Sequence, residues 1–179
     1  MAAITVFCSS SPRTPSVYLE DAAAVGRSLA ACGHLLVTGA GNTGCMGAVT
    51  DACLAAGGRA RGVILQKFVD EGLHHPELEE MLVVAAMRER KERLGEAVDG
   101  YIVLPGGPGT WEEFWEVAVE RQIETHRRPV VVLNTAGFYH HFIAQAARAA
   151  DEGFLYGPVS ALFSVTTDPA EAVRMATAG

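Results

Sequence analysis

Short apolar runs alternate with longer stretches of helical pattern along the whole chain. Strands that are apolar on both faces are typical of a parallel sheet covered by helices on both sides. The sequence therefore predicts one doubly wound α/β domain over residues 1–179, with a mostly parallel sheet of about six or seven strands. The expected strands are 4–8, 34–39, 61–65, 81–85, 101–104, 130–133 and 162–166, and the expected helices are 16–31, 46–56, 87–97, 111–125, 138–151 and 168–177.

Composition and charge exclude several classes of protein. Of 179 residues, 49% are hydrophobic and 20% charged, which is typical of a globular protein and not of a disordered one. The net charge of −7 argues against nucleic acid as a partner, because a phosphate-backbone binder carries a basic stripe. We expect a cytoplasmic protein without a membrane partner, since the first apolar run is typical of a strand and not of a signal peptide. The four cysteines have no metal-like spacing, so we expect free thiols and no metal site.

In sheets of this kind, ligands bind at the carboxyl ends of the strands. Four polar or glycine-rich segments directly follow expected strands, at residues 9–11, 39–47, 87–91 and 105–110. We expect them to lie along one edge of the sheet and to form the binding site. In the first three segments, the candidate substrate-binding residues are Ser10, Gly41 and Met87.

The segment GAGNTG, residues 39–44, fits the G-x-G-x-x-G pattern of dinucleotide-binding loops. However, it follows the second expected strand, and Gln66 stands where a ribose-binding acid is expected. The sequence therefore favours a close backbone approach to a phosphate or ribose over NAD binding. Glycines that only close a tight turn are the alternative.

The segment PGGPGT, residues 105–110, is the stronger candidate for an anion site. Its glycines can adopt positive φ and leave backbone N–H groups bare at the start of a helix, where the dipole favours an anion. Since no Gly-Lys-Ser/Thr follows, a monophosphate fits better than a nucleoside triphosphate. Thr110 is expected at the N-cap, from which its hydroxyl could also reach a phosphate.

Glu113 has two interpretations. Thr110-x-x-Glu113 is formally a capping box, in which Glu113 reaches back to the N-cap. A catalytic role is favoured for two reasons. A carboxylate beside a bound phosphate is destabilised by repulsion, and helix capping alone does not explain why it would be placed there. In addition, Glu113 shares an inward face with Val117. On other faces of this helix we expect a solvated acidic stripe (Glu112, Glu116, Glu120 and Glu124) and core residues (Trp111, Trp115 and Val119).

Arg90 and Lys91 lie in the expected first turn of their helix, where the dipole disfavours positive charge. A bound phosphate or Glu113 would favour them there. The alternative is a solvated basic turn paired with neighbouring glutamates. The adjacent histidine pairs at 74–75 and 140–141 are poor chelators, and we expect them on the surface or in loops.

The segments MRERK (87–91) and PGGPGTWEE (105–113) together resemble the M-x-x-R-K and P-G-G-x-G-T-x-x-E signature of the Lonely Guy family, the cytokinin riboside 5'-monophosphate phosphoribohydrolases. The resemblance extends over nearly the whole chain. It implies a Rossmann-like homodimer, with helices 87–97 and 111–125 near the interface. The implied reaction is hydrolysis of the N-glycosidic bond of an adenine-type nucleoside 5'-monophosphate, a cytokinin nucleotide or AMP, to the free base and ribose 5-phosphate. No metal or redox cofactor is implied.

By position, the resemblance implies Arg90 and Glu113 as the catalytic pair. Arg88, Pro108, Trp111 and Glu124 depart from the family's common residues, which bears on the preferred base. The implied substrate-binding residues are Lys91, Gly106, Gly107, Pro108, Gly109, Thr110, Glu112 and Thr125.

Two alternatives remain. Relatives have carried the label lysine decarboxylase, but that reaction normally needs pyridoxal phosphate on a lysine, and the chain has only Lys67 and Lys91. A non-catalytic carrier of a nucleotide or pterin cofactor on the same fold is the other. The Arg90–Glu113 pair favours the hydrolase, because a carrier needs the phosphate loop but not the pair.

Overall fold

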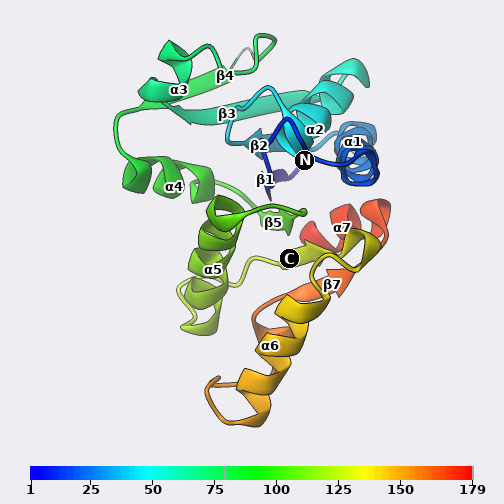
Figure 1. The fold of residues 1–179 in the computed structure, drawn as a ribbon, viewed down its shortest axis with the longest axis vertical. Coiled ribbons are helices and arrows are strands. Elements are labelled where there is room, and N and C mark those ends of the chain that lie inside the picture. Colours follow the sequence, from blue (N-terminus) through cyan, green and yellow to red (C-terminus); the bar gives the residue numbers. More distant parts are fainter. Residues whose placement is uncertain (79, 179) are drawn as a thin grey trace.

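A parallel seven-stranded sheet forms the centre of the computed structural model, which describes residues 1–78 and 80–178 (Figure 1). The strand order is β4-β3-β2-β1-β5-β6-β7, and every neighbouring pair is parallel. The expected doubly wound α/β fold is thereby confirmed. The strands are β1 (Ala3–Phe7), β2 (Leu35–Thr38), β3 (Arg59–Leu65), β4 (Glu80–Val84), β5 (Gly100–Val103), β6 (Val130–Leu133) and β7 (Ser164–Thr166).

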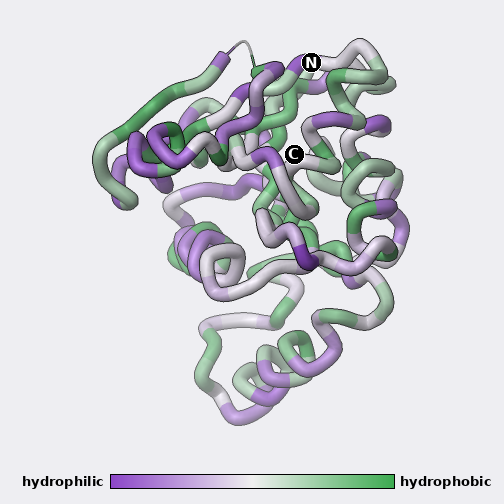
Figure 2. Tube along the Cα trace, turned by 45° about the horizontal axis from the view of Figure 1, so that its top comes forward, coloured by the Kyte–Doolittle hydropathy of each residue, from purple (hydrophilic) through white to green (hydrophobic). Residues whose placement is uncertain are grey.

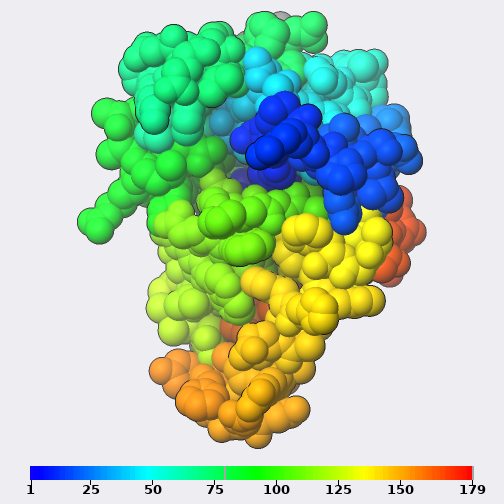
Figure 3. All heavy atoms as spheres, in the orientation of Figure 1, coloured from blue at the N-terminus to red at the C-terminus, as the bar shows by residue number. Residues whose placement is uncertain are grey.

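Helices pack on both faces of this sheet. The helices are α1 (Ser16–Ala31), α2 (Gly44–Ala55), α3 (Gln66–Asp70), α4 (Met87–Gly95), α5 (Pro108–Gln122), α6 (His140–Asp151) and α7 (Pro169–Ala176), with short 3-10 turns at η1 (Thr135–Gly137) and η2 (Val159–Ala161). The short helix α3 was not expected from the sequence. In Figure 3, α6 and the segment after it form the narrow end of the molecule.

Residues of the central strands β1, β2, β3, β5 and β6 belong to two separate hydrophobic cores, one on each face of the sheet. In β1, Ile4 and Val6 pack with residues of α1, α2 and α7, whereas Phe7 packs with residues of α4, α5 and α6. This explains why the strands are apolar without interruption. Figure 2 shows hydrophobic segments through the centre of the trace, with hydrophilic segments mostly on outer helices and loops. Among the described residues, no helix is long and apolar enough to cross a membrane.

Some side chains lie differently from the expectation. Trp111, Trp115 and Val119 are exposed, because the inward face of α5 carries Phe114 and Val117 instead. His75 lies in a loop, as expected, but it is buried there, since its Nε2 lies 3.0 Å from Asp51 Oδ1 and its Nδ1 accepts the Glu77 N–H. These contacts fix the loop that follows α3. The correction that concerns Thr110 is described with the site.

Strand order places the predicted loops together. β1 lies between β2 and β5 in the sheet. The strands that follow β1 in the chain, β2 to β4, extend the sheet on one side of β1, and β5 to β7 extend it on the other. Such a switch point opens a crevice at the carboxyl ends of the strands. The two loops that border it are joined by a hydrogen bond from the Ser9 N–H to the Pro105 carbonyl, at 3.3 Å.

Candidate active site

All four predicted segments contribute to one cavity at this edge of the sheet. The cavity has a volume of about 370 Å3. It takes residues from the serine loop after β1, the first turn of α2, helix α4 and the start of α5. Its lining residues are Cys8, Ser9, Ser10, Ser11, Met46, Phe68, Arg90, Gly107, Pro108, Gly109, Thr110 and Glu113.

The PGGPGT loop ends in the first turn of α5, which starts earlier than expected. Gly107 is the N-cap and Pro108 the first helical residue, a position that proline favours because its φ is already helical. The N–H groups of Gly109 and Thr110 precede the first intrahelical bond, which Trp111 donates to the Gly107 carbonyl. With the helix dipole, they form a suitable site for an anion.

The glycines of this loop provide room, not unusual backbone angles. Gly106, Gly107 and Gly109 are not among the glycines with positive φ, so that expectation is wrong. A Cβ at Gly106 would lie 2.1 Å from Thr110 Oγ1, whereas a Cβ at Gly107 or Gly109 would point into open space among the described residues. The loop is therefore tight on its helix side and accessible on its cavity side.

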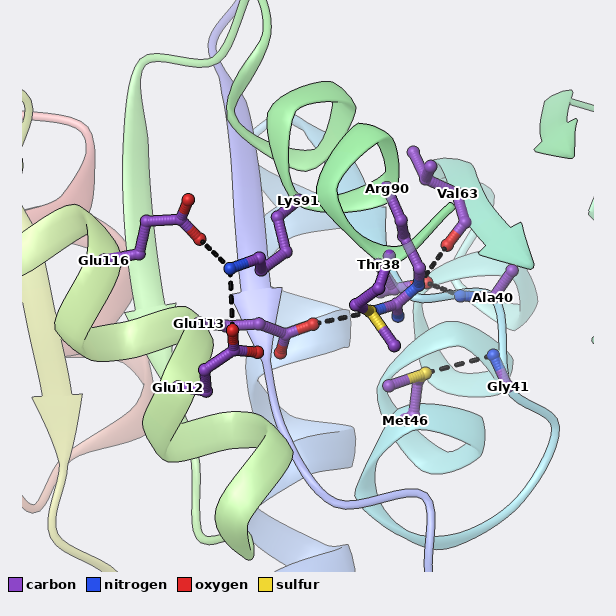
Figure 4. Close-up of polar contacts among 11 residues, drawn as sticks. Thr38, Ala40, Gly41, Met46, Val63, Arg90, Lys91, Glu112, Glu113 and Glu116 are labelled. Carbon is purple, nitrogen blue, oxygen red and sulfur yellow. Dashed lines mark hydrogen bonds and ion pairs between the residues drawn. The ribbon is translucent and has the colours of Figure 1, made fainter. Parts of the chain in front are cut away.

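The early start of α5 rules out the capping box. Thr110 is the third residue of the helix and is buried, so it is not the N-cap. Glu113 consequently lies inside the helix. Its carboxylate Oε1 accepts a hydrogen bond from Arg90 Nη1 at 2.8 Å (Figure 4).

Arg90 is held from two sides. Besides its bond to Glu113, its Nε donates to the Val63 carbonyl at the end of β3, at 3.0 Å. The guanidinium fits there because residue 39 is a glycine: a Cβ on Gly39 would lie 2.0 Å from Arg90 Nη2. Both side chains of the Arg90–Glu113 pair are only 10% exposed. The pair is therefore a fixed, largely dehydrated feature of the site.

Burial determines the ionisation of Glu113. Desolvation raises the pKa of Glu113 above its ordinary value, and the nearby Arg90 guanidinium opposes this rise. A carboxyl group with a raised pKa beside a cavity is suited to proton transfer near neutral pH. The neighbouring Cys8 thiol also has its pKa raised by burial, so it remains neutral.

The second glycine loop holds the serine loop in place. Gly44 has a φ of +63°, and a Cβ there would lie 2.8 Å from the carbonyl oxygens of Ser9 and Ser11. Thr43 Oγ1 donates to the Ser10 carbonyl at 2.6 Å. The closely packed backbone accounts for the G-x-G-x-x-G pattern without a dinucleotide.

A second, more apolar cavity of about 260 Å3 adjoins the first, with which it shares Ser10, Met46, Phe68 and Arg90. Gly41 lines it, as do Phe68 of α3 and Leu73 of the following loop. No sequence pattern indicated Phe68 and Leu73, since α3 is a single short turn and Leu73 lies in the loop after it. Met87 is half-exposed at the start of α4, with its Sδ 3.9 Å from Arg90 Nη1.

Lys91, Glu112 and Thr125, which were predicted to bind substrate, line neither the cavity at the PGGPGT loop (the glycine-loop cavity) nor the adjoining one. Lys91 Nζ forms ion pairs with Glu112 Oε1 at 2.7 Å and Glu116 Oε2 at 3.0 Å, beyond Glu113 (Figure 4). The acidic stripe is therefore partly paired, not fully solvated. Thr125 follows the far end of α5, where its Oγ1 donates to the Glu120 carbonyl at 2.9 Å. Substrate binding by Lys91, Glu112 and Thr125 stays a prediction.

Several known proteins are similar to this chain. A family model described as "possible lysine decarboxylase" matches residues 46–176. The chain is 38% identical over 154 residues to a cytokinin riboside 5'-monophosphate phosphoribohydrolase of Rhodococcoides fascians, covering 85% of this chain and 77% of the relative. It is 37% identical over 155 residues to a probable phosphoribohydrolase of the same name from Oryza sativa, covering 87% and 63%. The solved molybdenum cofactor binding protein of Rippkaea orientalis has a TM-score of 0.73 at 18% identity, covering 97% of this chain and 93% of that one.

The fold and the site define a doubly wound α/β protein with a glycine-rich loop at a helix start and a buried arginine–glutamate pair beside it. The chain belongs to the Lonely Guy family, whose family model bears the lysine decarboxylase description and whose curated relatives are named phosphoribohydrolases. The resemblance carried by residues 87–91 and 105–113 is thereby confirmed. The likeness to the molybdenum cofactor protein, at 18% identity, shows the fold alone.

The lysines do not fit a pyridoxal phosphate site. An attacking lysine must be neutral. Lys67 is exposed on α3, with its Nζ 3.9 Å from Glu71 Oε1. The hydrogen bonds that the Lys91 amine donates to Glu112 and Glu116 raise the pKa of Lys91, which keeps that amine charged. The decarboxylase description therefore does not suit these residues.

The buried pair generates a stability prediction. We expect Arg90→Met to destabilise the protein by about 3 kcal/mol, because Glu113 is left buried without its partner. Adding Glu113→Gln should recover about 1 kcal/mol or more, since the unpaired charge is removed. Urea unfolding monitored by circular dichroism measures both effects.

The control for this prediction is Arg93→Met on the same helix, because Arg93 pairs with Glu96 at the exposed surface. It should change stability little. Equal destabilisation by Arg90→Met and Arg93→Met would contradict the role of the buried pair.

Proposed function

We propose that this protein hydrolyses the N-glycosidic bond of adenine-type nucleoside 5'-monophosphates, a cytokinin nucleotide or AMP, releasing the free base and ribose 5-phosphate. The observation that carries the proposal is the buried Arg90–Glu113 pair, 2.8 Å apart, in the same cavity as the PGGPGT loop. The activity named for the relatives from Rhodococcoides fascians and Oryza sativa supports the same reaction.

The 5'-phosphate is the anchor in this proposal. The N–H groups at the start of α5 and the Thr110 hydroxyl would receive it, with Ser10 facing the same cavity. Gly106, Gly107, Pro108 and Gly109 shape the loop around the anion. Binding at a group remote from the broken bond supplies orientation, which lowers the barrier to reaction.

The chemistry follows from the position of Glu113. As the bond between C1' and the base nitrogen breaks, positive charge develops on the ribose. The Glu113 carboxylate stabilises that charge and takes a proton from the water that forms the new bond to C1'. The departing base nitrogen is protonated from solvent. Arg90 favours the ionised form of Glu113 and holds it in place.

The base would occupy the adjoining apolar cavity. This cavity is lined by Gly41, Met46, Phe68 and Leu73, and it meets the first cavity at Arg90. A flat, mostly apolar ring suits such walls. Its volume of about 260 Å3 also gives space for an apolar substituent on the adenine amino group. Met87, exposed beside Arg90, is the candidate cover for the base.

A non-catalytic carrier is the competing proposal, because solved molybdenum cofactor proteins share this fold. Their identity to the chain is 18% and 24%, so the likeness concerns architecture. A carrier requires an anion-binding loop but no buried carboxylate at the reacting bond. The Arg90–Glu113 pair therefore favours the hydrolase.

We also propose that the protein acts as a cytoplasmic homodimer with α4 and α5 near the interface. An exposed apolar stripe runs along α5 at every fourth residue, formed by Trp111, Trp115, Val119 and Ile123. Exposed apolar stripes of this kind are typical of protein–protein contacts. A second copy of the chain would cover it.

The phosphate anchor predicts a strong preference for nucleotides. We expect kcat/KM for adenosine to be lower than for AMP by about a thousandfold or more, because adenosine lacks the group that orients it. Release of free adenine, followed by chromatography, measures both rates. Equal rates on AMP and adenosine would contradict the proposal that the 5'-phosphate anchors the substrate.

Replacing Glu113 tests its catalytic role. Glu113→Gln keeps the shape of the side chain but can neither take a proton nor stabilise the sugar cation, so kcat should fall by about a hundredfold or more. Glu112→Gln is the matched control and should have a much milder effect. Melting temperatures of both variants separate loss of chemistry from loss of fold. Near wild-type activity of folded Glu113→Gln would refute the mechanism.

The dimer proposal predicts a change of mass. Val119→Asp places a charge in the apolar stripe of α5. Light scattering at micromolar concentration should therefore show a monomer for this variant and a dimer for the wild type. Val17→Asp, at an exposed apolar position of α1, is the control and should remain paired. A monomeric wild type would contradict the proposal.

A further inference from the structure

Lys91 is turned away from the glycine-loop cavity. It follows Arg90 directly in α4, yet the two side chains diverge around Glu113 (Figure 4). Lys91 lies instead in a cavity of about 280 Å3 between α4 and α5, which Glu113 also lines. Glu113 therefore separates Lys91 from the cavity in which the PGGPGT loop lies.

The contacts of Lys91 are two carboxylates. Its Nζ is 2.7 Å from Glu112 Oε1 and 3.0 Å from Glu116 Oε2, and its side chain is 18% exposed. Glu112 precedes Glu113 in α5, and Glu116 follows it by one turn. Three carboxylates thus share one turn of helix, and Arg90 pairs with only one of them.

These carboxylates act on Glu113 through space. Burial is the main cause of the raised pKa of Glu113, and the charges of Glu112 and Glu116 raise it further. A cation paired with both Glu112 and Glu116 opposes that repulsion. Both glutamates are about half exposed, so solvent screens part of the effect but not all of it.

We propose that Lys91 is a positioning residue that neutralises Glu112 and Glu116 and thereby keeps Glu113 ionised, instead of binding the substrate phosphate. The inference rests on the proposed hydrolase function, because an ionised Glu113 is what that reaction requires. In this proposal Lys91 influences the ionisation of the catalytic carboxylate and does not contact the substrate.

The other groups around Glu113 do not replace Lys91. On the cavity side, Arg90 is the cation and Cys8 is a buried thiol. On the Lys91 side, Arg128 donates to the Tyr101 hydroxyl and the Gly95 carbonyl, both at 2.7 Å. The further carboxylates that line this side are Glu92, Glu96 and Glu120, which only add negative charge.

The test is the pH profile of kcat/KM on AMP. Glu113 must be ionised, so a raised pKa shifts the acidic limb of the profile to higher pH. In Lys91→Met we expect that shift, with kcat/KM on the acidic side falling roughly threefold to tenfold relative to wild type. The value of kcat/KM at high pH should stay close to that of the wild type, and so should KM. Lys91→Arg, which keeps the charge, should retain the normal limb.

Two further variants separate charge balance from substrate binding. Removing both acids from Lys91→Met, with Glu112→Gln and Glu116→Gln, should return the limb toward the wild-type position. The pair Glu112→Gln and Glu116→Gln with Lys91 intact should move it to lower pH. The proposal would be overturned if Lys91→Met raised KM for AMP without shifting the acidic limb of the pH profile, and if the triple variant kept that higher KM. An unchanged profile and KM would overturn it equally.

A readout independent of turnover separates this inference from the proposed function. The side-chain carboxyl carbon of Glu113, followed by NMR during a pH titration, should titrate at higher pH in Lys91→Met than in wild type. If the wild type fails to cleave AMP, the hydrolase proposal fails, and the titration still decides the role of Lys91. An unmoved Glu113 titration overturns the inference even if AMP is cleaved.

Discussion

The site depends on one buried ion pair between Arg90 and Glu113. Two charges with 10% exposed side chains are stable only when each satisfies the other, and the surrounding fold is arranged for this. Gly39 leaves space for the guanidinium, and the Val63 carbonyl accepts its Nε. Because α4 supplies the arginine and α5 the glutamate, the pair also fixes these helices relative to the PGGPGT loop.

Much of this arrangement could be predicted from sequence, because it depends on local pattern and topology. The strands are apolar on both faces, which indicates a parallel sheet with two cores. The carboxyl ends of parallel strands share one edge, so Ser10, Arg90 and the PGGPGT loop were expected together, and one cavity contains them. The inward direction of Glu113 followed from helical periodicity with Val117, and both are buried.

The errors have physical causes that a single sequence conceals. Pro108 starts α5 three residues earlier than expected, so Thr110 became a buried helical residue and not a cap. The stripe of Trp111 and Trp115 is apolar but exposed, because periodicity identifies a face and not what covers it. The opposite directions of Arg90 and Lys91 depend on the packing of α4 against α5, which spacing along the chain does not encode.

In the proposed reaction, water attacks the ribose carbon C1' while the Glu113 carboxylate stabilises the sugar cation. Reaction with AMP in water enriched in oxygen-18, followed by mass spectrometry of the products, shows which bond is broken. We expect free adenine together with ribose 5-phosphate whose phosphate group is unlabelled. Its C1' oxygen becomes labelled, both by the reaction and by exchange with the labelled water when the sugar ring opens. Adenosine together with labelled inorganic phosphate, or AMP recovered unchanged, would refute the proposed reaction.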